Sequence, residues 1–191
     1  MKIAIFGGSF NPCHIMHKQI ALDLLEKKYC DKVIYVPTGD KYNKNHLEDD
    51  MHRLNMLKIM CKDNEKLEVN DFELHGDLKY TYQTLDYFSG VYKDCELYFV
   101  LGYDNLKGFK TWRRYEYVLS NYKLLVIDRD DIDRDLLEDE FNDYLKNIIF
   151  TSVKPKKISS SSIREDLKKY RYSNLIEKEV LDYIIENKLY E

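Results

Sequence analysis

The chain has 191 residues, of which 44% are hydrophobic, with 30 basic and 34 acidic side chains and a net charge of -4. This length supplies one sizeable hydrophobic core but not two, and seven glycines with three prolines are too few for a collagen-like or linker-rich chain. The charge balance excludes the basic surface that is typical of nucleic-acid-binding proteins, so we expect no nucleic-acid partner.

Membrane and secretory segments are not expected either. No segment approaches the roughly 20 consecutive apolar residues of a membrane span, and the apolar start of the chain is too short for a signal peptide. The four cysteines are widely separated and form no CxxC motif, which is typical of reduced thiols. We therefore expect a cytoplasmic protein with no membrane partner. The sequence does not report the oligomeric state, so a homo-oligomer stays open.

Short apolar runs alternate with longer segments of helical periodicity along the whole chain. The runs predict strands buried on both faces at residues 2–6, 32–36, 67–69, 97–101, 122–127 and 147–150. The longer segments predict helices near residues 14–28, 49–63, 80–92, 112–120, 132–146 and 175–188. This alternation predicts a single α/β domain with a mostly parallel sheet, in which ligands bind at the carboxyl ends of the strands.

The segment between the first strand and the first helix, GGSFNPCHIMH at residues 7–17, has the features of an anion site. Gly7 and Gly8 let the backbone come close to a ligand, and the N-terminus of the following helix favours a negative charge. His14 and His17 are three residues apart, so they lie on one face of the first helical turn. Either feature alone would predict only a tight turn or two surface histidines, but together they predict a nucleotide-binding loop.

A metal site is a weaker interpretation of the same residues. Zinc needs at least a third protein ligand, and no Cys, His, Asp or Glu lies at ligand spacing from the two histidines. The acidic stretch 128–140 carries an amphipathic apolar face, which favours a solvated loop entering a helix over a metal site. We therefore expect no metal-binding residues.

A second candidate element, KKISSSSIRE, occupies residues 156–165 and precedes a helical pattern that runs to about residue 170. Serine is a preferred N-cap, and its hydroxyl can serve either a backbone N–H or a ligand phosphate. Arg164 would fall in the first turn, where a cation is unfavourable unless it pairs with an anion. This conflict favours a phosphate site over a capped helix with a surface arginine.

Both segments resemble the signatures of the nucleotidyltransferases with the HxGH motif. GGSFNPCHIMH is similar to GG[ST]FDPxHxGH, with Asn11 for Asp and Met16 for Gly, and ISSSSIR is similar to ISSTxIR. The resemblance implies a Rossmann-like nucleotidyltransferase fold with helices on both faces of the sheet, and a C-terminal helical segment, about 159–191, that carries the second motif. It also implies that the ATP phosphates are bound by Gly7, Gly8, Ser9, Phe10, His14, His17, Ser159, Ser160, Ser161 and Arg164.

Further segments resemble the nicotinate mononucleotide adenylyltransferase family over essentially the whole chain. They include VP at 36–37, RLNML at 53–57, YTYQTL at 80–85, LYFVLGYD at 97–104, TW at 111–112 and the tail 175–190. The resemblance implies that Gly102 and Asp104 lie at the ATP ribose, and that Tyr80, Thr81 and Trp112 contact the pyridine ring of the acceptor or its substituent. Lys44 is a candidate for the acceptor phosphate, although residues 41–43 depart from the Pro-Pro-His of the family pattern.

The implied reaction joins ATP and nicotinate mononucleotide and releases pyrophosphate, with His14, His17 and Arg164 as the catalytic residues. Mg²⁺ would arrive with ATP, held mainly by phosphates and water, and no tightly bound cofactor is expected. Other acceptors remain open: nicotinamide mononucleotide first, then phosphopantetheine, then the acceptor of a CTP-using relative. A nucleotide-binding sensor without turnover is the alternative of another class, and the three retained catalytic side chains speak against it.

Overall fold

The computed structural model describes residues 1–39, 47–77, 79–127, 134–156 and 158–191. Six strands form one sheet in the order β3-β2-β1-β4-β5-β6, and every neighbouring pair is parallel. The strands are β1 (Lys2–Gly8), β2 (Lys32–Pro37), β3 (Leu67–Val69), β4 (Glu96–Gly102), β5 (Lys123–Ile127) and β6 (Ile148–Phe150). The predicted α/β fold with a parallel sheet is therefore confirmed.

The α-helices are α1 (Ile15–Glu26), α2 (Asp50–Cys61), α3 (Thr81–Val91), α4 (Tyr103–Lys107), α5 (Tyr115–Asn121), α6 (Arg134–Glu140), α7 (Ser160–Tyr170) and α8 (Lys178–Glu186). Among the described residues, the 3₁₀ segments Phe72–Leu74, Phe109–Thr111 and Asn142–Asn147 lie between them. Among the described residues, no helix has both the length and the apolar character needed to cross a membrane.

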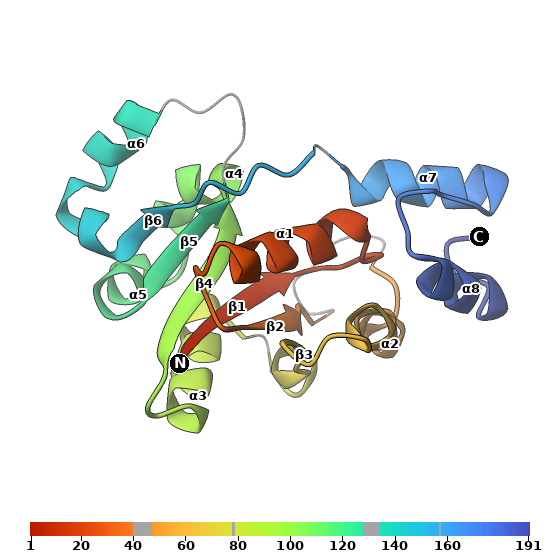
Figure 1. Cartoon of the computed structure of the whole chain (residues 1–191), viewed down its shortest axis with the longest axis horizontal. Helices are drawn as coiled ribbons and strands as arrows, with labels where there is room; N and C mark the ends of the chain where they lie inside the picture. The colour runs from red at the N-terminus through yellow and green to blue at the C-terminus, as the bar shows by residue number, and fades with distance from the viewer. Residues whose placement is uncertain (40–46, 78, 128–133, 157) are drawn as a thin grey trace.

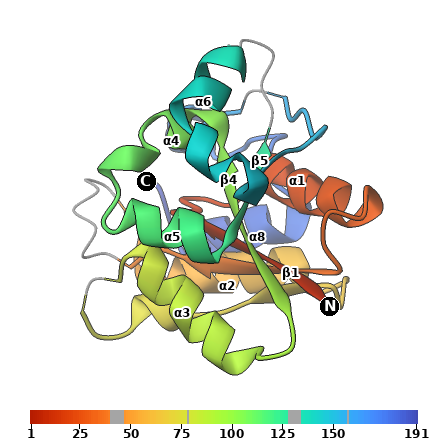
Figure 2. The same ribbon diagram turned by 90° about the vertical axis from the view of Figure 1, so that its left-hand side faces the viewer.

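Two hydrophobic layers cover the two faces of the sheet because successive strand residues point to opposite sides. Ala4 of β1 packs in one layer with residues of α1, α2, α7 and α8. Its neighbours Ile3 and Ile5 pack in the other layer with residues of α3, α4, α5 and α6. Both views show the strands between these sets of helices (Figures 1 and 2). Burial on both faces explains why the strands read as nearly continuous apolar runs.

The order of the strands reverses at β1, which pairs with β2 on one side and β4 on the other. Such a switch point leaves a crevice at the carboxyl ends of the two strands, where ligands of open α/β sheets bind. The chain segments that follow β1 and β4 carry Ser9 and Tyr103 at that edge. Figure 1 shows α7 and α8 on the same side, beyond the end of the β1 arrow.

One predicted helix differs from the structure. Residues 132–146 were expected to form a single helix, but α6 ends at Glu140 and a 3₁₀ segment follows. Phe141 lies at the junction, is almost fully buried, and belongs to the core layer formed by α3 to α6. Because this side chain is buried in the core, the α-helix does not continue past it. The next turn has i→i+3 hydrogen bonds instead.

Candidate active site

The loop after β1 turns back on itself before α1 begins. Asn11 and Pro12 form a turn, the peptide bond between them is cis, and Phe10 has a φ of 46°. Phe10 and Asn11 are both buried, and Phe10 packs edge-on against Phe6 and His17. The loop is therefore a packed element whose backbone is held in place, as a phosphate-binding loop requires.

His14 and His17 form a stacked pair at the start of α1. Their ring centroids are 3.7 Å apart and the ring planes differ by 19°. His14 is the N-cap residue, and its backbone N–H donates to Nδ1 of His17 at 3.2 Å. Since Nδ1 of His17 accepts this hydrogen bond, the neutral imidazole carries its proton on Nε2 and can donate it to a ligand oxygen.

Burial keeps both imidazoles neutral. Desolvation lowers the pKa of His14 to about 4 and lowers the pKa of His17 well below its ordinary value, with His14 adding a smaller repulsion to His17. Nδ1 of His14 is buried and has no hydrogen-bond partner among the residues that the structure describes. An orphaned polar atom beside a helix N-terminus is typical of a site that is completed by a ligand.

The second predicted element reaches the same loop from the far end of the sequence. Ser159 caps α7 through its side-chain oxygen, which accepts from the backbone N–H of Ser161. The Ser160 hydroxyl donates to the carbonyl oxygen of Pro12 at 3.3 Å. Arg164 donates to the carbonyl oxygen of Asn11 at 2.7 Å and to the Ser161 hydroxyl at 3.1 Å. The first turn of α7 is thereby fixed against the loop after β1.

A cavity of about 300 Å³ lies between these two elements, and we call it the phosphate cavity. It brings together residues of both predicted motifs and one, Leu47, that the motifs did not include. Its lining residues are Ser9, Phe10, Asn11, His17, Leu47, Ser160 and Arg164. None of these described lining residues carries a negative charge, so the cavity is suited to an anion.

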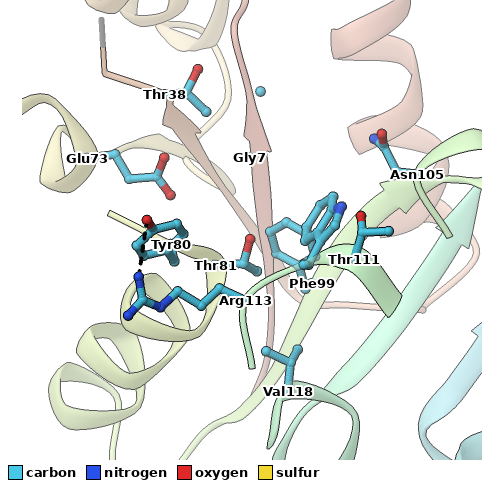
Figure 3. Close-up of a pocket in the computed structure, with 12 residues that line it drawn as sticks. Gly7, Thr38, Glu73, Tyr80, Thr81, Phe99, Asn105, Thr111, Arg113 and Val118 are labelled. Atoms are coloured by element: carbon cyan, nitrogen blue, oxygen red, sulfur yellow. Dashed lines mark hydrogen bonds between the residues drawn. The ribbon is translucent and has the colours of Figure 1, made fainter. Parts of the chain in front are cut away.

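A second cavity, of about 410 Å³, opens at the switch point between β1 and β4, and we call it the aromatic cavity (Figure 3). Phe99 of β4, Trp112 and Tyr80 supply its aromatic surface, and Phe99 meets Trp112 edge-on at 6.0 Å. Its lining residues are Gly7, Gly8, Thr38, Glu73, Tyr80, Thr81, Phe99, Asn105, Thr111, Trp112, Arg113 and Val118. Flat aromatic walls of this kind suit a planar ring.

Consecutive residues of one loop line the two cavities. Gly7 and Gly8 line the aromatic cavity, whereas Ser9 and Phe10 line the phosphate cavity. A Cβ on Gly8 would approach the Phe10 ring to 3.0 Å, so the bare backbone is needed where the loop folds over that ring. Ligand groups that contact this loop in the two cavities would therefore contact neighbouring residues of it.

Arg53 is a buried residue that the sequence analysis did not assign to the site. Its side chain is fully buried and donates to three backbone carbonyl oxygens, those of Glu48, Ser9 and Thr38, at 3.0, 2.8 and 2.6 Å. It also pairs with the carboxylate of Asp50. Arg53 therefore ties the loop after β1 to the loop after β2, which are the walls of the two cavities.

Asn11 is held by the C-terminus of the chain. Its side-chain oxygen accepts hydrogen bonds from the hydroxyl of Tyr190 at 2.8 Å and from the backbone N–H of Glu48 at 3.2 Å. The Tyr190 side chain is largely buried, and desolvation raises the pKa of its phenol. The last turn of the protein is thus part of the support of the phosphate cavity.

The remaining predicted site residues have different outcomes. Gly102 ends β4 and precedes α4, and Asp104 lies exposed in the first turn of that helix, at the same sheet edge as the loop after β1. A Cβ at Gly102 would meet no atom within 4 Å, so this glycine leaves open space rather than relieving a clash. Lys44 lies outside the described residues. Among those described, no cluster of three or more His, Cys, Asp and Glu could hold a metal ion.

Several lining residues carried no sequence signal. Thr38, Glu73, Phe99 and Asn105 come from the loop after β2, a 3₁₀ segment, β4 and α4, and their local patterns do not identify them as site residues. Arg113 could have been suspected because it follows the single tryptophan of the chain. The sheet brings these residues together by placing β1, β2 and β4 side by side.

Comparison with known proteins gives the same assignment as the motifs. A cytidylyltransferase-like family model matches residues 5–166. A probable nicotinate-nucleotide adenylyltransferase of Clostridium acetobutylicum is 36% identical over 99% of this chain and 98% of its own length. A second, of Fusobacterium nucleatum, is 41% identical over 94% of this chain and 95% of its own length.

A solved structure supports the fold. The Plasmodium falciparum nicotinic acid mononucleotide adenylyltransferase complexed with NaAD superposes with a TM-score of 0.78 at 24% identity, over 99% of this chain and 97% of that one. This likeness shows a shared fold. Taken with the family model and the curated relatives, it places the chain in the cytidylyltransferase-like nucleotidyltransferases, as a member of the nicotinate-nucleotide adenylyltransferase family.

Proposed function

We propose that this protein transfers the adenylyl group of ATP to nicotinate mononucleotide, forming nicotinate adenine dinucleotide and pyrophosphate. The observation that carries the proposal is that consecutive residues, Gly8 and Ser9, line the aromatic cavity and the phosphate cavity respectively. A triphosphate in the phosphate cavity and a pyridine nucleotide in the aromatic cavity would bring their phosphates together beside these two residues. Proximity of this kind is a main source of rate enhancement in phosphoryl and nucleotidyl transfer.

The chemistry needs no general base. An oxygen of the mononucleotide phosphate, already anionic near pH 7, attacks the α-phosphorus of ATP and forms the new P–O bond. The bond from the α-phosphorus to the bridging oxygen of the β-phosphate breaks, and pyrophosphate leaves with the electron pair. What the protein must supply is alignment and stabilisation of the charge that develops on the phosphoryl oxygens.

We assign these roles to the residues around the phosphate cavity. His17 donates from Nε2 to a phosphoryl oxygen, and His14, stacked on it, supplies a second imidazole beside the helix N-terminus. Arg164 supplies a permanent positive charge, and its guanidinium contacts the loop after β1 through the carbonyl oxygen of Asn11. The hydroxyls of Ser159, Ser160 and Ser161 and the backbone of residues 7–10 complete the set, and Gly102 with Asp104 receives the ribose.

Mg²⁺ is proposed to enter with ATP as part of the substrate. The described lining residues of the phosphate cavity include hydroxyls, an imidazole, an amide and a guanidinium but no carboxylate. Such a set fits a metal that takes its oxygens from the phosphates and water rather than from the protein. When bound, the ion would neutralise charge on the triphosphate.

The acceptor assignment rests on the aromatic cavity. Trp112 and Phe99 offer faces and edges to a pyridine ring, and Tyr80 with Thr81 forms the start of α3, where N–H groups without helical partners can meet an anionic substituent. A phosphopantetheine acceptor has no flat ring for these walls. Nicotinamide mononucleotide stays as the second acceptor, because its ring is the same.

Two coarser features complete the proposal. We propose a single domain, supported by the residues of α7 and α8 that share a core layer with α1 and α2. We also propose a cytoplasmic location, supported by four free thiols, three of them buried.

The deciding experiment is a pyrophosphate-release assay with ATP and a panel of acceptors. We expect the highest kcat/KM with nicotinate mononucleotide, a lower value with nicotinamide mononucleotide, and none above background with phosphopantetheine. ATP binding without pyrophosphate release for any acceptor would indicate a sensor and overturn the proposal.

A further inference from the structure

The aromatic cavity contains one opposed pair of charges. Among the described residues that line it, Arg113 is the one cation and Glu73 the one anion. Glu73 is held by the hydroxyl of Thr84, which donates to its Oε1 at 2.6 Å. Figure 3 draws Glu73 and Tyr80 on one side of the cavity, with Arg113 extending to Tyr80 below Thr81.

The guanidinium of Arg113 has a defined resting place. It lies over the ring of Tyr80, with its central carbon 4.9 Å from the ring centroid, and Nη1 is 3.4 Å from the phenol oxygen. Cation–π contact restrains the long side chain without neutralising its charge. Arg113 is exposed at the mouth of the cavity, so it can pair with an arriving anion without first breaking a buried ion pair.

The position of Arg113 indicates which of the two anionic groups of a pyridine mononucleotide, the ring substituent or the phosphate, would lie near it. Arg113 follows Trp112 directly and contacts Tyr80, so it belongs to the end of the cavity that holds the ring. The phosphate of the acceptor must lie at the other end, at Gly8 and Ser9, to reach ATP. The group nearest Arg113 is therefore the substituent on the pyridine ring.

We propose that Arg113 is the specificity-determining residue that selects a carboxylate over a carboxamide on the acceptor ring. This inference rests on the proposed function and deepens it. A guanidinium makes charge-assisted hydrogen bonds with a carboxylate, which are roughly twice as strong as those between neutral groups. A neutral amide gains no such charge pairing, and the Glu73 carboxylate in the same cavity disfavours an anion that is not paired with Arg113.

The neighbouring residue provides a matched control. Arg114 has the same side chain and a similar aromatic setting, with its guanidinium over the rings of Tyr82 and Tyr117 at 5.0 and 4.7 Å. It is not among the residues that line the aromatic cavity. Replacing Arg114 therefore removes one positive charge and its cation–π contacts, as replacing Arg113 does, but at a position that does not line the cavity.

The test measures kcat/KM for nicotinate mononucleotide and for nicotinamide mononucleotide in wild type, R113Q, R113K and R114Q. We expect R113Q to reduce the ratio of the two values about tenfold, mainly through KM for the nicotinate form, because the variant loses the charge-assisted hydrogen bond to the carboxylate. In R113K the ratio of the two kcat/KM values should stay close to that of wild type, and in R114Q it should be unchanged. Added salt should lower the wild-type ratio more than that of R113Q.

Three other results of this experiment would overturn the inference. An equal loss for both acceptors in R113Q would mean that Arg113 binds the common phosphate, and it would overturn the inference. An unchanged ratio would also overturn it while leaving the proposed function intact. If wild type turned over neither acceptor, the proposed function and this inference would fall together.

Discussion

The hydroxyl of Tyr190 donates a hydrogen bond to the side-chain oxygen of Asn11 at 2.8 Å, joining the penultimate residue of the chain to the loop after β1. The carbonyl oxygen of Asn11 accepts from Arg164 at 2.7 Å. Three segments far apart in the sequence therefore meet at one residue on the wall of the phosphate cavity. The loop that we propose to bind ATP is thus positioned by contacts far away along the chain.

Removing the Tyr190 hydroxyl tests this support. Tyr190→Phe keeps the packing but loses one hydrogen bond, which contributes about 1 kcal/mol. We expect kcat/KM for ATP to fall about fivefold while the melting temperature changes by only a few degrees. Tyr172→Phe, at an exposed tyrosine, is the control and should match wild type. Unchanged ATP kinetics in Tyr190→Phe would show that Asn11 needs no such support.

His17 should be required for turnover and not for folding. We expect His17→Ala to lower kcat at least about 100-fold, because the loss of a preorganised donor to a developing oxyanion costs about that factor. His75→Ala removes an exposed imidazole paired with Asp71 and should leave kcat unchanged. Near-normal turnover in a folded His17→Ala protein would remove His17 from the mechanism.

Arg53 should matter for stability as well as for activity. Arg53→Lys cannot donate to the carbonyl oxygens of Glu48, Ser9 and Thr38 together, and it leaves buried acceptors unpaired. Breaking a buried charged network of this kind costs about 3–5 kcal/mol of unfolding free energy. Denaturant unfolding of Arg53→Lys should show such a loss, and Arg134→Lys, at an exposed arginine, should show almost none. Equal stabilities of the two variants would contradict the role of Arg53.

Gly39 is constrained by close packing rather than by a special backbone conformation. A Cβ at this position would lie 2.5 Å from the carbonyl oxygen of Glu73, which lines the aromatic cavity. Gly39→Ala should displace that wall, raising the KM for the mononucleotide severalfold and lowering stability by about 1–3 kcal/mol. A Cβ at Gly90 would meet no atom within 4 Å, so Gly90→Ala should neither raise the KM for the mononucleotide nor lower the stability. Equal kinetics for the two variants would rule out the displacement.

The free energy of unfolding should decrease as the pH is lowered, in a range set by the pKa values of His14 in the unfolded and folded protein. Burial lowers the pKa of His14 in the folded protein to about 4 from 6.5 in the unfolded chain. Between these values the unfolded state binds more protons than the folded state, so stability rises with pH and is lost as pH falls. The expected loss from pH 7 to pH 4 is about 3 kcal/mol at this residue.

Comparing His14→Gln with wild type isolates this contribution from the carboxylates that titrate nearby. Urea unfolding at several pH values should give a shallower decline in the variant. Parallel curves for the two proteins would show that His14 is not held neutral by burial.

The two candidate phosphate-binding elements could be proposed from the sequence because each is local in it. Two glycines before a helix and serines at an N-cap form anion sites through backbone N–H groups within a few residues of one another. The strands could be predicted for a similar reason, since burial on both faces requires uninterrupted apolar runs. The helix expected at residues 132–146 was wrong because periodicity does not reveal that burial of Phe141 interrupts it.

The supporting contacts could not be predicted. Nothing near Arg53 in the sequence indicates that its guanidinium binds Ser9 and Thr38, and nothing near Tyr190 indicates Asn11 as its partner. Glu73 and Phe99 reach the aromatic cavity from separate segments whose patterns show only a loop and a strand. These relationships depend on how distant elements pack together.

The sequence by itself determined the parallel α/β architecture, the two candidate anion-binding segments and the family, because hydrophobic periodicity and loop chemistry are properties of neighbouring residues. Only the tertiary structure decided that Gly8 and Ser9 line two neighbouring cavities, that Arg113 stands beside Tyr80, and that Tyr190 supports the first loop. These arrangements arise when the sheet order places β1 between β2 and β4, which brings distant side chains within reach of one another.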